Sequence, residues 1–234
     1  MTNGSKGHQN YTENELIKIR KQEMLNVAER FGLIYNVLDN EDAELEVTMK
    51  NRLALIKKIR EWNADLVITH RPNTYHPDHR YTSDLVNDAS FLIRVPKVLP
   101  NVPALNKISV FLYMSDSFKK PNAFHPDIVI DITPVIDDKL EMLHAHKSQF
   151  YECLPWLNDT LDQIPHTDEQ RKVWLKNWRL PKVKQPFSAE TVKGLTNVYG
   201  EKWDMSMIEY LESYELCEYG RQPSIDELKD MLPL

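Results

Sequence analysis

The chain has 234 residues, of which 29 are Lys or Arg and 35 are Asp or Glu, so its formal net charge is −6. This length fits one large domain, or one domain with an appendage. The acidic balance, without a basic stripe, argues against a nucleic-acid binder and a polybasic membrane-surface protein. No apolar run approaches the roughly 20 residues of a membrane span, the first residues are polar, and cysteines are few, so a cytoplasmic protein is expected.

The first half of the chain alternates helical and strand patterns. A capping box at residues 12–15 begins a helix that ends at Gly32, and helix-period apolar residues predict another over 47–62. Further helices are predicted over 77–92 and 135–150, and strands over 33–38, 64–70, 108–114 and 127–132. Strands that alternate with helices are typical of an α/β fold with a mostly parallel sheet.

The pattern changes at about Pro155. Four prolines, at 155, 165, 181 and 186, divide short helical patterns that include 169–178 and 190–198, and strand signals disappear. We therefore expect an α/β domain over residues 1–154 and a helical extension over 155–234 that packs on it. Because no strand precedes the first residues, the sheet is expected to lack its first strand, and the exposed edges favour a homo-oligomer.

The stretch ITHRPNTYHPDHR, residues 68–80, follows a predicted buried strand. Ligands bind at the carboxyl ends of strands in open α/β sheets, and Pro77 and Asp78 suit the first turn of a helix. His76 and His79, three residues apart at that helix start, can face one cavity. The alternative is that proline and aspartate only start the helix while both histidines are solvated. The neighbouring Asn73 and Tyr75 favour a functional loop.

Arg20 lies in the centre of the apolar face of the first helix. A guanidinium is rarely buried without a partner. Arg20 therefore either pairs internally with Glu23 or points into a polar cavity as a substrate anchor. Its apolar neighbours on that face are Leu16, Met24, Val27 and Phe31.

Two weaker candidates flank these features. His144 and His146 are two residues apart and cannot share a helix face, so at most one is expected to point into a site. Asn3 and Gly4 belong to a glycine-containing loop, TNGSKGH, that carries little information alone.

Together these motifs resemble the LmbE-like, or PIG-L, family of zinc-dependent deacetylases of N-acetylated sugars and related amides. The residues that carry the resemblance are TNGSKGH, RKQE followed by AERFG, ITHRPNTYHPDHR, HAHKSQF and CEYGR. The likeness covers residues 1 to about 150 well and the rest more loosely. It implies a Rossmann-like three-layer α/β/α fold with a zinc site at the strand ends.

The resemblance also implies roles for individual residues. His79 would be a metal ligand, and His76 would stabilise the oxyanion or assist the leaving amine, with Asp78 orienting it. Arg20 would contact the substrate, a small N-acetylated sugar or glycoconjugate. Asn73, Tyr75 and Asn3 are expected to contact the substrate as well.

This sequence departs from the family at one motif. The Ala-His-Pro-Asp-Asp motif that supplies the other His and Asp ligands is not found in these residues, and it is expected upstream of Met1. Zn²⁺, or another divalent metal, would then lack two of three ligands, and we expect little or no hydrolase activity from this chain. The alternative is a non-catalytic remnant or carbohydrate-binding protein of the same fold that has lost its metal.

Overall fold

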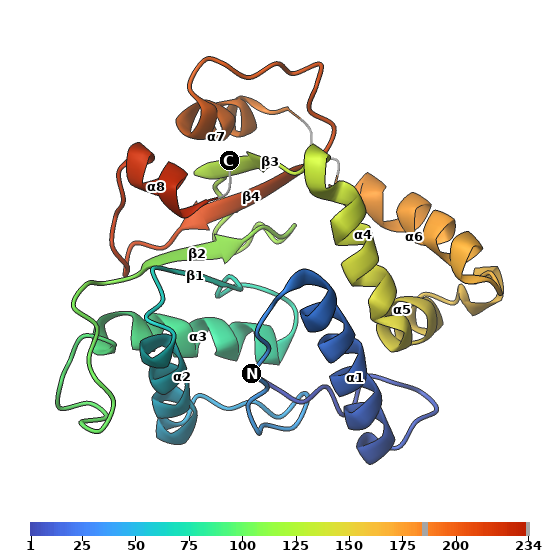
Figure 1. Ribbon diagram of the computed structural model, residues 1–234, viewed down its shortest axis with the longest axis horizontal. Helices are drawn as coiled ribbons and strands as arrows, with labels where there is room; N and C mark the ends of the chain where they lie inside the picture. The colour runs from blue at the N-terminus through green and yellow to red at the C-terminus, as the bar shows by residue number, and fades with distance from the viewer. Residues whose placement is uncertain (184–186, 233–234) are drawn as a thin grey trace. The chain divides into compact units, whose positions relative to one another are not determined.

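The computed structural model describes residues 1–183 and 187–232. The chain divides into two compact units, each built from two separate stretches (Figure 1). The helical unit comprises Met1–Glu44 and Ile132–Gln185, and the sheet unit comprises Leu45–Asp131 and Pro186–Leu234.

A four-stranded sheet organises the sheet unit. Its strands are β1 (Leu66–Thr69), β2 (Val110–Met114), β3 (Ile128–Asp131) and β4 (Leu211–Leu216), in the spatial order β1-β2-β4-β3 (Figure 1). β1 and β2 are parallel, with Leu66 opposite Val110, whereas β4 is antiparallel to both β2 and β3. β1, β2 and β3 therefore run in one direction, and β4 lies between β2 and β3 in the opposite direction.

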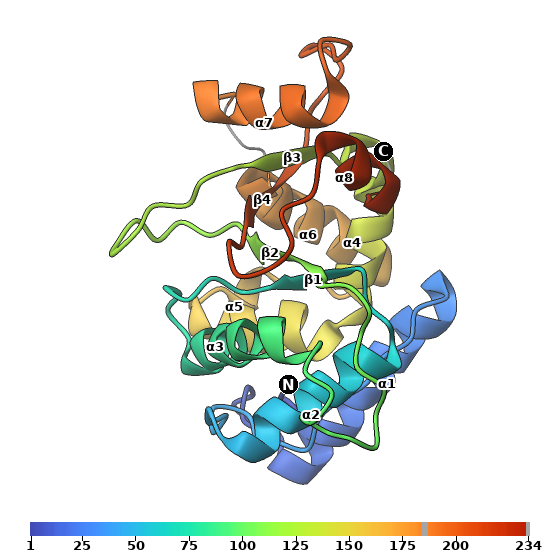
Figure 2. The same ribbon diagram turned by 90° about the vertical axis from the view of Figure 1, so that its left-hand side faces the viewer.

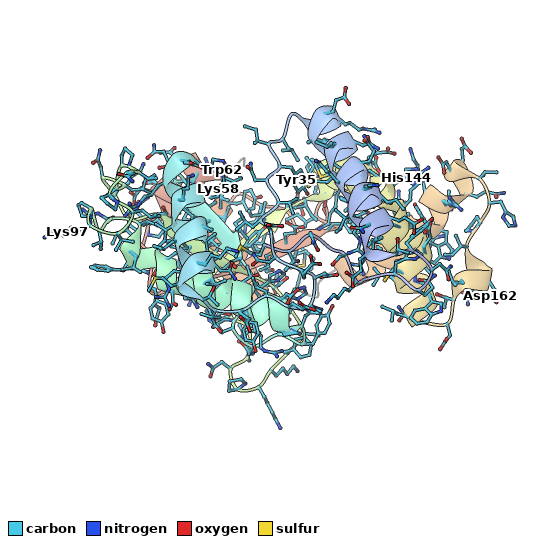
Figure 3. The ribbon with its side chains drawn as sticks, turned by 90° about the horizontal axis from the view of Figure 1, so that it is seen from below. Tyr35, Lys58, Trp62, Lys97, His144 and Asp162 are labelled. Atoms are coloured by element: carbon cyan, nitrogen blue, oxygen red, sulfur yellow. The ribbon has the colours of Figure 1, made fainter. Side chains whose placement is uncertain are left out.

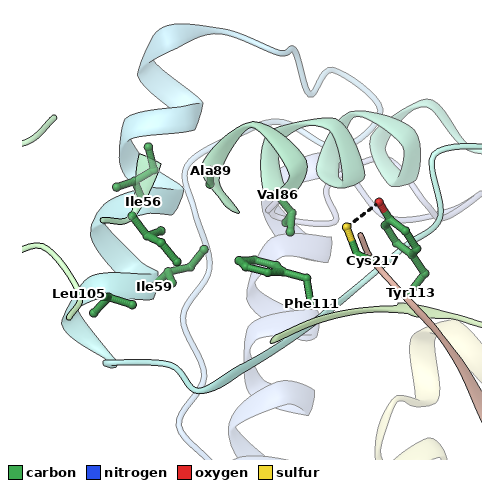
Figure 4. Close-up of a cluster of buried hydrophobic side chains, with 9 residues drawn as sticks. Ile56, Ile59, Val86, Ala89, Leu105, Phe111, Tyr113 and Cys217 are labelled. Atoms are coloured by element: carbon green, nitrogen blue, oxygen red, sulfur yellow. Dashed lines mark hydrogen bonds between the residues drawn. The ribbon is translucent and has the colours of Figure 1, made fainter. Parts of the chain in front are cut away.

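Helices cover both faces of this sheet (Figure 2). They are α2 (Met49–Glu61), α3 (Pro77–Leu92), α7 (Ala189–Tyr199) and α8 (Ile225–Met231). Successive strand residues point to opposite faces, and on β2 the buried Phe111 and Tyr113 pack with α2 and α3 (Figure 4). Val110 and Leu112 pack on the other face with α7 and α8. The unit thus has the predicted three-layer α/β/α arrangement.

The helical unit begins with the predicted first helix, α1 (Glu13–Phe31). Thr12 and Glu15 form the expected capping box, and Gly32 ends the helix in the left-handed conformation with a φ of 65°. The remaining elements are η1 (Thr133–Val135), α4 (Ile136–Ala145), the π-helical turn η2 (Ser148–Cys153), α5 (Leu154–Leu157), η3 (Leu161–Gln163) and α6 (Asp168–Val183). The single helix predicted over 135–150 is therefore interrupted near His146, between α4 and η2.

The mixed α/β class is confirmed, the mostly parallel sheet is confirmed only in part, and two other details of the prediction are wrong. The sheet is only partly parallel, because two of its three strand pairs are antiparallel. Residues 155–234 are not purely helical, because they supply β4 to the interior of the sheet. Residues 33–38 form no strand: Ile34 is 79% exposed and Tyr35 (labelled in Figure 3) 46%. An apolar run becomes a strand only where a neighbour takes up its backbone hydrogen bonds.

The two compact units are divided differently from the domains predicted at residues 154 and 155. Residues 132–185 cluster with the N-terminal stretch, and the chain from 186 onward clusters with residues 45–131. The predicted domain division itself stays a prediction. Within residues 1–183 and 187–232, none of the helices combines the length and apolar character needed to cross a membrane.

A close approach between α7 and β3 generates the first prediction. A Cβ added at Gly194 would lie 2.7 Å from the carbonyl oxygen of Pro126 and would clash with Val129. Helix propensity alone favours Gly→Ala by about 1 kcal/mol, but overpacking typically costs about 1–3 kcal/mol. We expect Gly194→Ala to lower the free energy of unfolding, measured by urea denaturation.

Lys193, the exposed neighbour of Gly194, provides a matched control. Lys193→Ala should change the free energy of unfolding by no more than about 0.5 kcal/mol. A Gly194→Ala variant as stable as the unaltered protein would contradict the close packing of α7 on β3.

Candidate functional site

The histidine loop, residues 70–76, connects the carboxyl end of β1 to α3 in the sheet unit. His76 is the N-cap of α3, with extended backbone angles, and its Nδ1 accepts a hydrogen bond from the backbone N–H of Asp78 at 3.2 Å. Pro77 occupies the first helical turn, as predicted. The buried Asp78 accepts from the backbone N–H of Leu45 at 3.3 Å. The helix start therefore fixes the position of the His76 ring.

Four aromatic rings gather at this loop and the first turn of α3. The rings of His76 and His79 are 4.9 Å apart between centroids. The Tyr75 ring stands edge-on to both, at 5.8 Å from His76 and 5.4 Å from His79. His70 stacks on His79 with centroids 4.0 Å apart and planes 7° from parallel. The structure thus brings together the predicted Tyr75, His76 and His79, and it adds His70.

His70 was not singled out from the sequence, although it follows the last residue of β1 and so lies at the strand end. Burial, with the nearby His79 as a smaller cause, lowers the pKa of His70 from 6.5 to about 4. The ring is therefore neutral at pH 7.

Arg71 anchors a second loop beside the first. Its side chain is 2% exposed and donates to Asp116 Oδ1 at 2.8 Å, to the carbonyl of Phe118 at 3.0 Å and to the carbonyl of Asn122 at 2.8 Å. Its Nε also lies 3.3 Å from Glu215 on β4. These contacts bind residues 116–122 to the carboxyl end of β1. The sequence alone does not indicate this role of Arg71.

Asn73 also binds residues 116–122 to the histidine loop. Its Nδ2 donates to the carbonyls of Asn122 at 3.0 Å and Lys120 at 3.3 Å. Arg80 in turn donates to the carbonyls of Thr74 and Tyr75 at 2.8 and 2.9 Å. Asn73 therefore holds the two loops together, and its predicted contact with a substrate stays a prediction.

A second group of predicted residues lies in the helical unit, around Arg20. Arg20 Nη2 donates to the carbonyl of Gly7 at 2.8 Å and to Gln149 Oε1 at 2.6 Å, and Nη1 lies 3.9 Å from Asp42. Its Nε is buried and has no hydrogen-bond partner. The guanidinium packs so closely on the TNGSKGH loop that a Cβ at Gly4 or Gly7 would lie 2.8 or 2.6 Å from it.

Arg20 lines a cavity of about 610 Å³. Asn3 lines the same cavity, and its side chain accepts from the backbone N–H of Ser5 at 3.1 Å. Other residues around it include Ile17, Met24, Tyr35, Val37, Asp42, His146, Gln149 and Phe150. An arginine among apolar walls and a few polar groups is a common pattern in sites for small polar ligands.

The alternative of an internal Arg20–Glu23 pair is not what the structure contains. Glu23 accepts from the backbone N–H and the hydroxyl of Ser148, both at 2.7 Å. Arg20 instead faces the cavity, and its partners Asp42 and Gln149 come from segments that the sequence did not connect with it.

The two histidines near the end of α4 lie in different surroundings, as expected. His146 lines the cavity, whereas the buried His144 (Figure 3) is bonded through Nδ1 to the hydroxyl of Tyr151 at 2.8 Å. Burial lowers the pKa of both imidazoles.

The histidine loop does not by itself meet the needs of a zinc ion. Zinc takes ligands at about 2.0–2.1 Å along the in-plane lone pairs of imidazole nitrogens. The nearly parallel stack of His70 on His79 does not aim both rings at one point. Across residues 1–183 and 187–232, no three His, Cys, Asp or Glu side chains are grouped so that they could hold a metal ion.

The neutral state of His70 leads to a prediction on pH. Its pKa of about 4 in the folded protein lies below 6.5, so the unfolded chain takes up the proton first as the pH falls. This contribution to stability is complete above about pH 6.5 and is lost as the pH falls toward 4. We expect His70→Asn to show a smaller loss of urea stability between pH 7 and pH 5 than the unaltered protein. Equal losses in both proteins would contradict the buried, neutral state.

The packing of Arg20 on Gly7 leads to another prediction. Gly7→Ala should destabilise the unaltered protein by about 1 kcal/mol, because the methyl group displaces the guanidinium. In an Arg20→Ala background the same change should cost little, giving a coupling of at least about 0.5 kcal/mol in a double-mutant cycle. A Lys18→Ala background, at an exposed position of α1, serves as the control and should show no coupling.

Comparison with known proteins matches the first part of the chain to a family. Residues 1–90 match the family described as PIG-L: GlcNAc-PI de-N-acetylase. The matched stretch contains the TNGSKGH loop, Arg20 and the complete histidine loop with the first turn of α3.

Three solved structures are similar to the chain. N,N'-diacetylchitobiose deacetylase from Pyrococcus horikoshii, complexed with an inhibitor, matches with a TM-score of 0.62 and 23% identity over 94% of this chain and 71% of that chain. GalB, the 4-carboxy-2-hydroxymuconate hydratase from Pseudomonas putida, matches with a TM-score of 0.62 and 18% identity over 88% and 74%. The conserved protein TT1542 from Thermus thermophilus matches with a TM-score of 0.54 and 19% identity over 85% and 73%.

At these identities the three structures establish a shared fold, and the fold serves proteins described as a deacetylase and as a hydratase. The family match is what links the sequence to one of them. Over residues 1–90 this chain matches the PIG-L, or LmbE-like, family.

Proposed function

We propose that the protein removes an acetyl group from an N-acetylated sugar or a related amide. Deacetylase activity is what its family resemblance implies. The observation that carries the proposal is the position of His76, which caps α3 at the end of β1 beside His79 and Tyr75, within the stretch that matches the family.

The capping bond defines the chemistry that His76 can offer. Because Nδ1 accepts the backbone N–H of Asp78, the proton of the neutral ring resides on Nε2. In amide hydrolysis, a water oxygen attacks the carbonyl carbon, the carbonyl oxygen takes up negative charge, and the amine leaves with a proton as the C–N bond breaks. The Nε2–H of His76 is proposed to donate a hydrogen bond to that oxygen, and the amine takes up the proton that the attacking water gives up.

Arg20 and Asn3 are proposed as substrate contacts. Arg20 presents a charged donor with an unused buried Nε to a cavity that also has apolar walls, which suits a hydroxyl-rich or anionic glycoconjugate. Tyr75 and Asn73 are proposed to contact the substrate at the histidine loop.

Zinc dependence belongs to the same proposal, with His79 as a ligand. The described residues do not complete a zinc site; a bound zinc would supply an activated water and positive charge for the carbonyl oxygen. A cytoplasmic location and association into a homo-oligomer are also proposed.

Acetate release from N,N'-diacetylchitobiose tests the function. We expect little acetate release from the unaltered chain, and His76→Ala should lower that rate further by about 10²–10³-fold, because the loss of one hydrogen-bond donor to the oxyanion typically costs that much. His166→Ala, at an exposed position, should leave the rate unchanged. Equal rates for His76→Ala and the unaltered chain would contradict the role of His76.

A second candidate is a carbohydrate-binding protein without catalysis. The parallel stack of His70 on His79 favours it, because the ring nitrogens do not converge. Sugar binding without acetate release, with or without added Zn²⁺, would support this candidate over the deacetylase.

A further inference from the structure

We infer that Tyr75 and Phe118 form a two-ring platform that receives the apolar face of the substrate's pyranose ring, and that Arg71 positions it. This inference rests on the proposed function and adds the residues that would select a sugar over a simple acetamide. Each element of the platform lies within the sheet unit.

Two exposed aromatic side chains lie next to each other, and one of them, Tyr75, borders His76 and His79. Tyr75 is 68% and Phe118 is 39% exposed, and their ring centroids are 6.2 Å apart with planes 34° from parallel. Single exposed apolar side chains are ordinary on protein surfaces. Two such rings from different loops, with Tyr75 next to His76, form a surface on which a flat apolar ligand face can be buried.

The orientation of Tyr75 suits this use. Its ring is perpendicular to His76 and His79, with interplanar angles of 84° and 81°. Tyr75 therefore forms a wall next to His76. A pyranose has a face of C–H groups and a rim of hydroxyls and amide, so the C–H face can lie on the rings while the rim reaches the polar groups of the loop.

Arg71 fixes the backbone position of Phe118. The backbone carbonyl of Phe118 accepts from Arg71, and its backbone N–H donates to Asp116 Oδ1 at 3.0 Å. Asp116 in turn accepts from the buried Arg71, so this ion pair holds both backbone polar groups of Phe118. Arg71 is accordingly a positioning residue, since it acts on the ligand surface through Phe118.

The test compares two probes by NMR titration of the full chain. N,N'-diacetylchitobiose carries pyranose rings, and N-acetylethanolamine carries the acetamide and a hydroxyl without a ring. Tyr75→Ala and Phe118→Ala should each raise the Kd for the disaccharide by roughly two- to tenfold, the range expected for one aromatic contact. Neither should change the Kd for N-acetylethanolamine, and Tyr75→Phe should keep the affinity of the unaltered chain.

Phe91 provides the matched control. It is 66% exposed on α3, fourteen residues beyond the helix start at Pro77, and thus roughly 20 Å along the helix from the loop. Phe91→Ala should leave both dissociation constants unchanged. Equal weakening of both probes by Phe118→Ala, no weakening of the disaccharide, or no disaccharide binding by the unaltered chain would each overturn the platform.

A double-mutant cycle tests the positioning role of Arg71. Arg71→Lys should weaken disaccharide binding as much as Phe118→Ala does, and it should cause no further loss in the Phe118→Ala background. Additive losses would show that Arg71 does not act through Phe118. Acetate release distinguishes the two proposals. Binding that depends on Tyr75 and Phe118, without acetate release, contradicts only the deacetylase proposal. Acetate release that does not depend on these two rings contradicts only the platform.

Discussion

The buried guanidinium of Arg71 is the interaction on which the edge of the sheet unit that carries the candidate site depends. A charge removed from water must find partners, and Arg71 finds them in Asp116, Glu215 and the backbone carbonyls of Phe118 and Asn122. These partners come from the loop after β2 and from β4. One side chain therefore ties the carboxyl end of β1 to two other segments, and the histidine loop leaves β1 from that fixed point.

Features with local signals could be predicted from the sequence. The capping box at Thr12 and Glu15 and the terminal Gly32 define α1 without reference to the rest of the molecule. Pro77 does the same for the start of α3, and this in turn brings His76 and His79 together. Arg20 could be found because a charge in the middle of an apolar helix face requires an explanation, and the structure gives it a cavity.

Features decided by distant partners could not be predicted. Residues 33–38 have the composition of a strand, yet pairing decides strand formation, and their side chains are largely exposed. The sequence of β4, LESYEL, has a weak strand pattern, partly because Glu215 is charged. The position of Glu215 in the strand is explained by Arg71, which lies beside it in the folded protein. Likewise Gln149, which bonds Arg20 from 129 residues away, could not be assigned from the sequence.

The capping role of His76 links local folding to chemistry. The same ring that satisfies a backbone N–H of the first turn of α3 is the proposed hydrogen-bond donor to the substrate, so its orientation exists only while that turn is formed. Helix ends fray at a lower free energy than whole domains unfold. On heating, any activity that depends on His76 should therefore be lost before the sheet unfolds, because the first turn of α3 frays first.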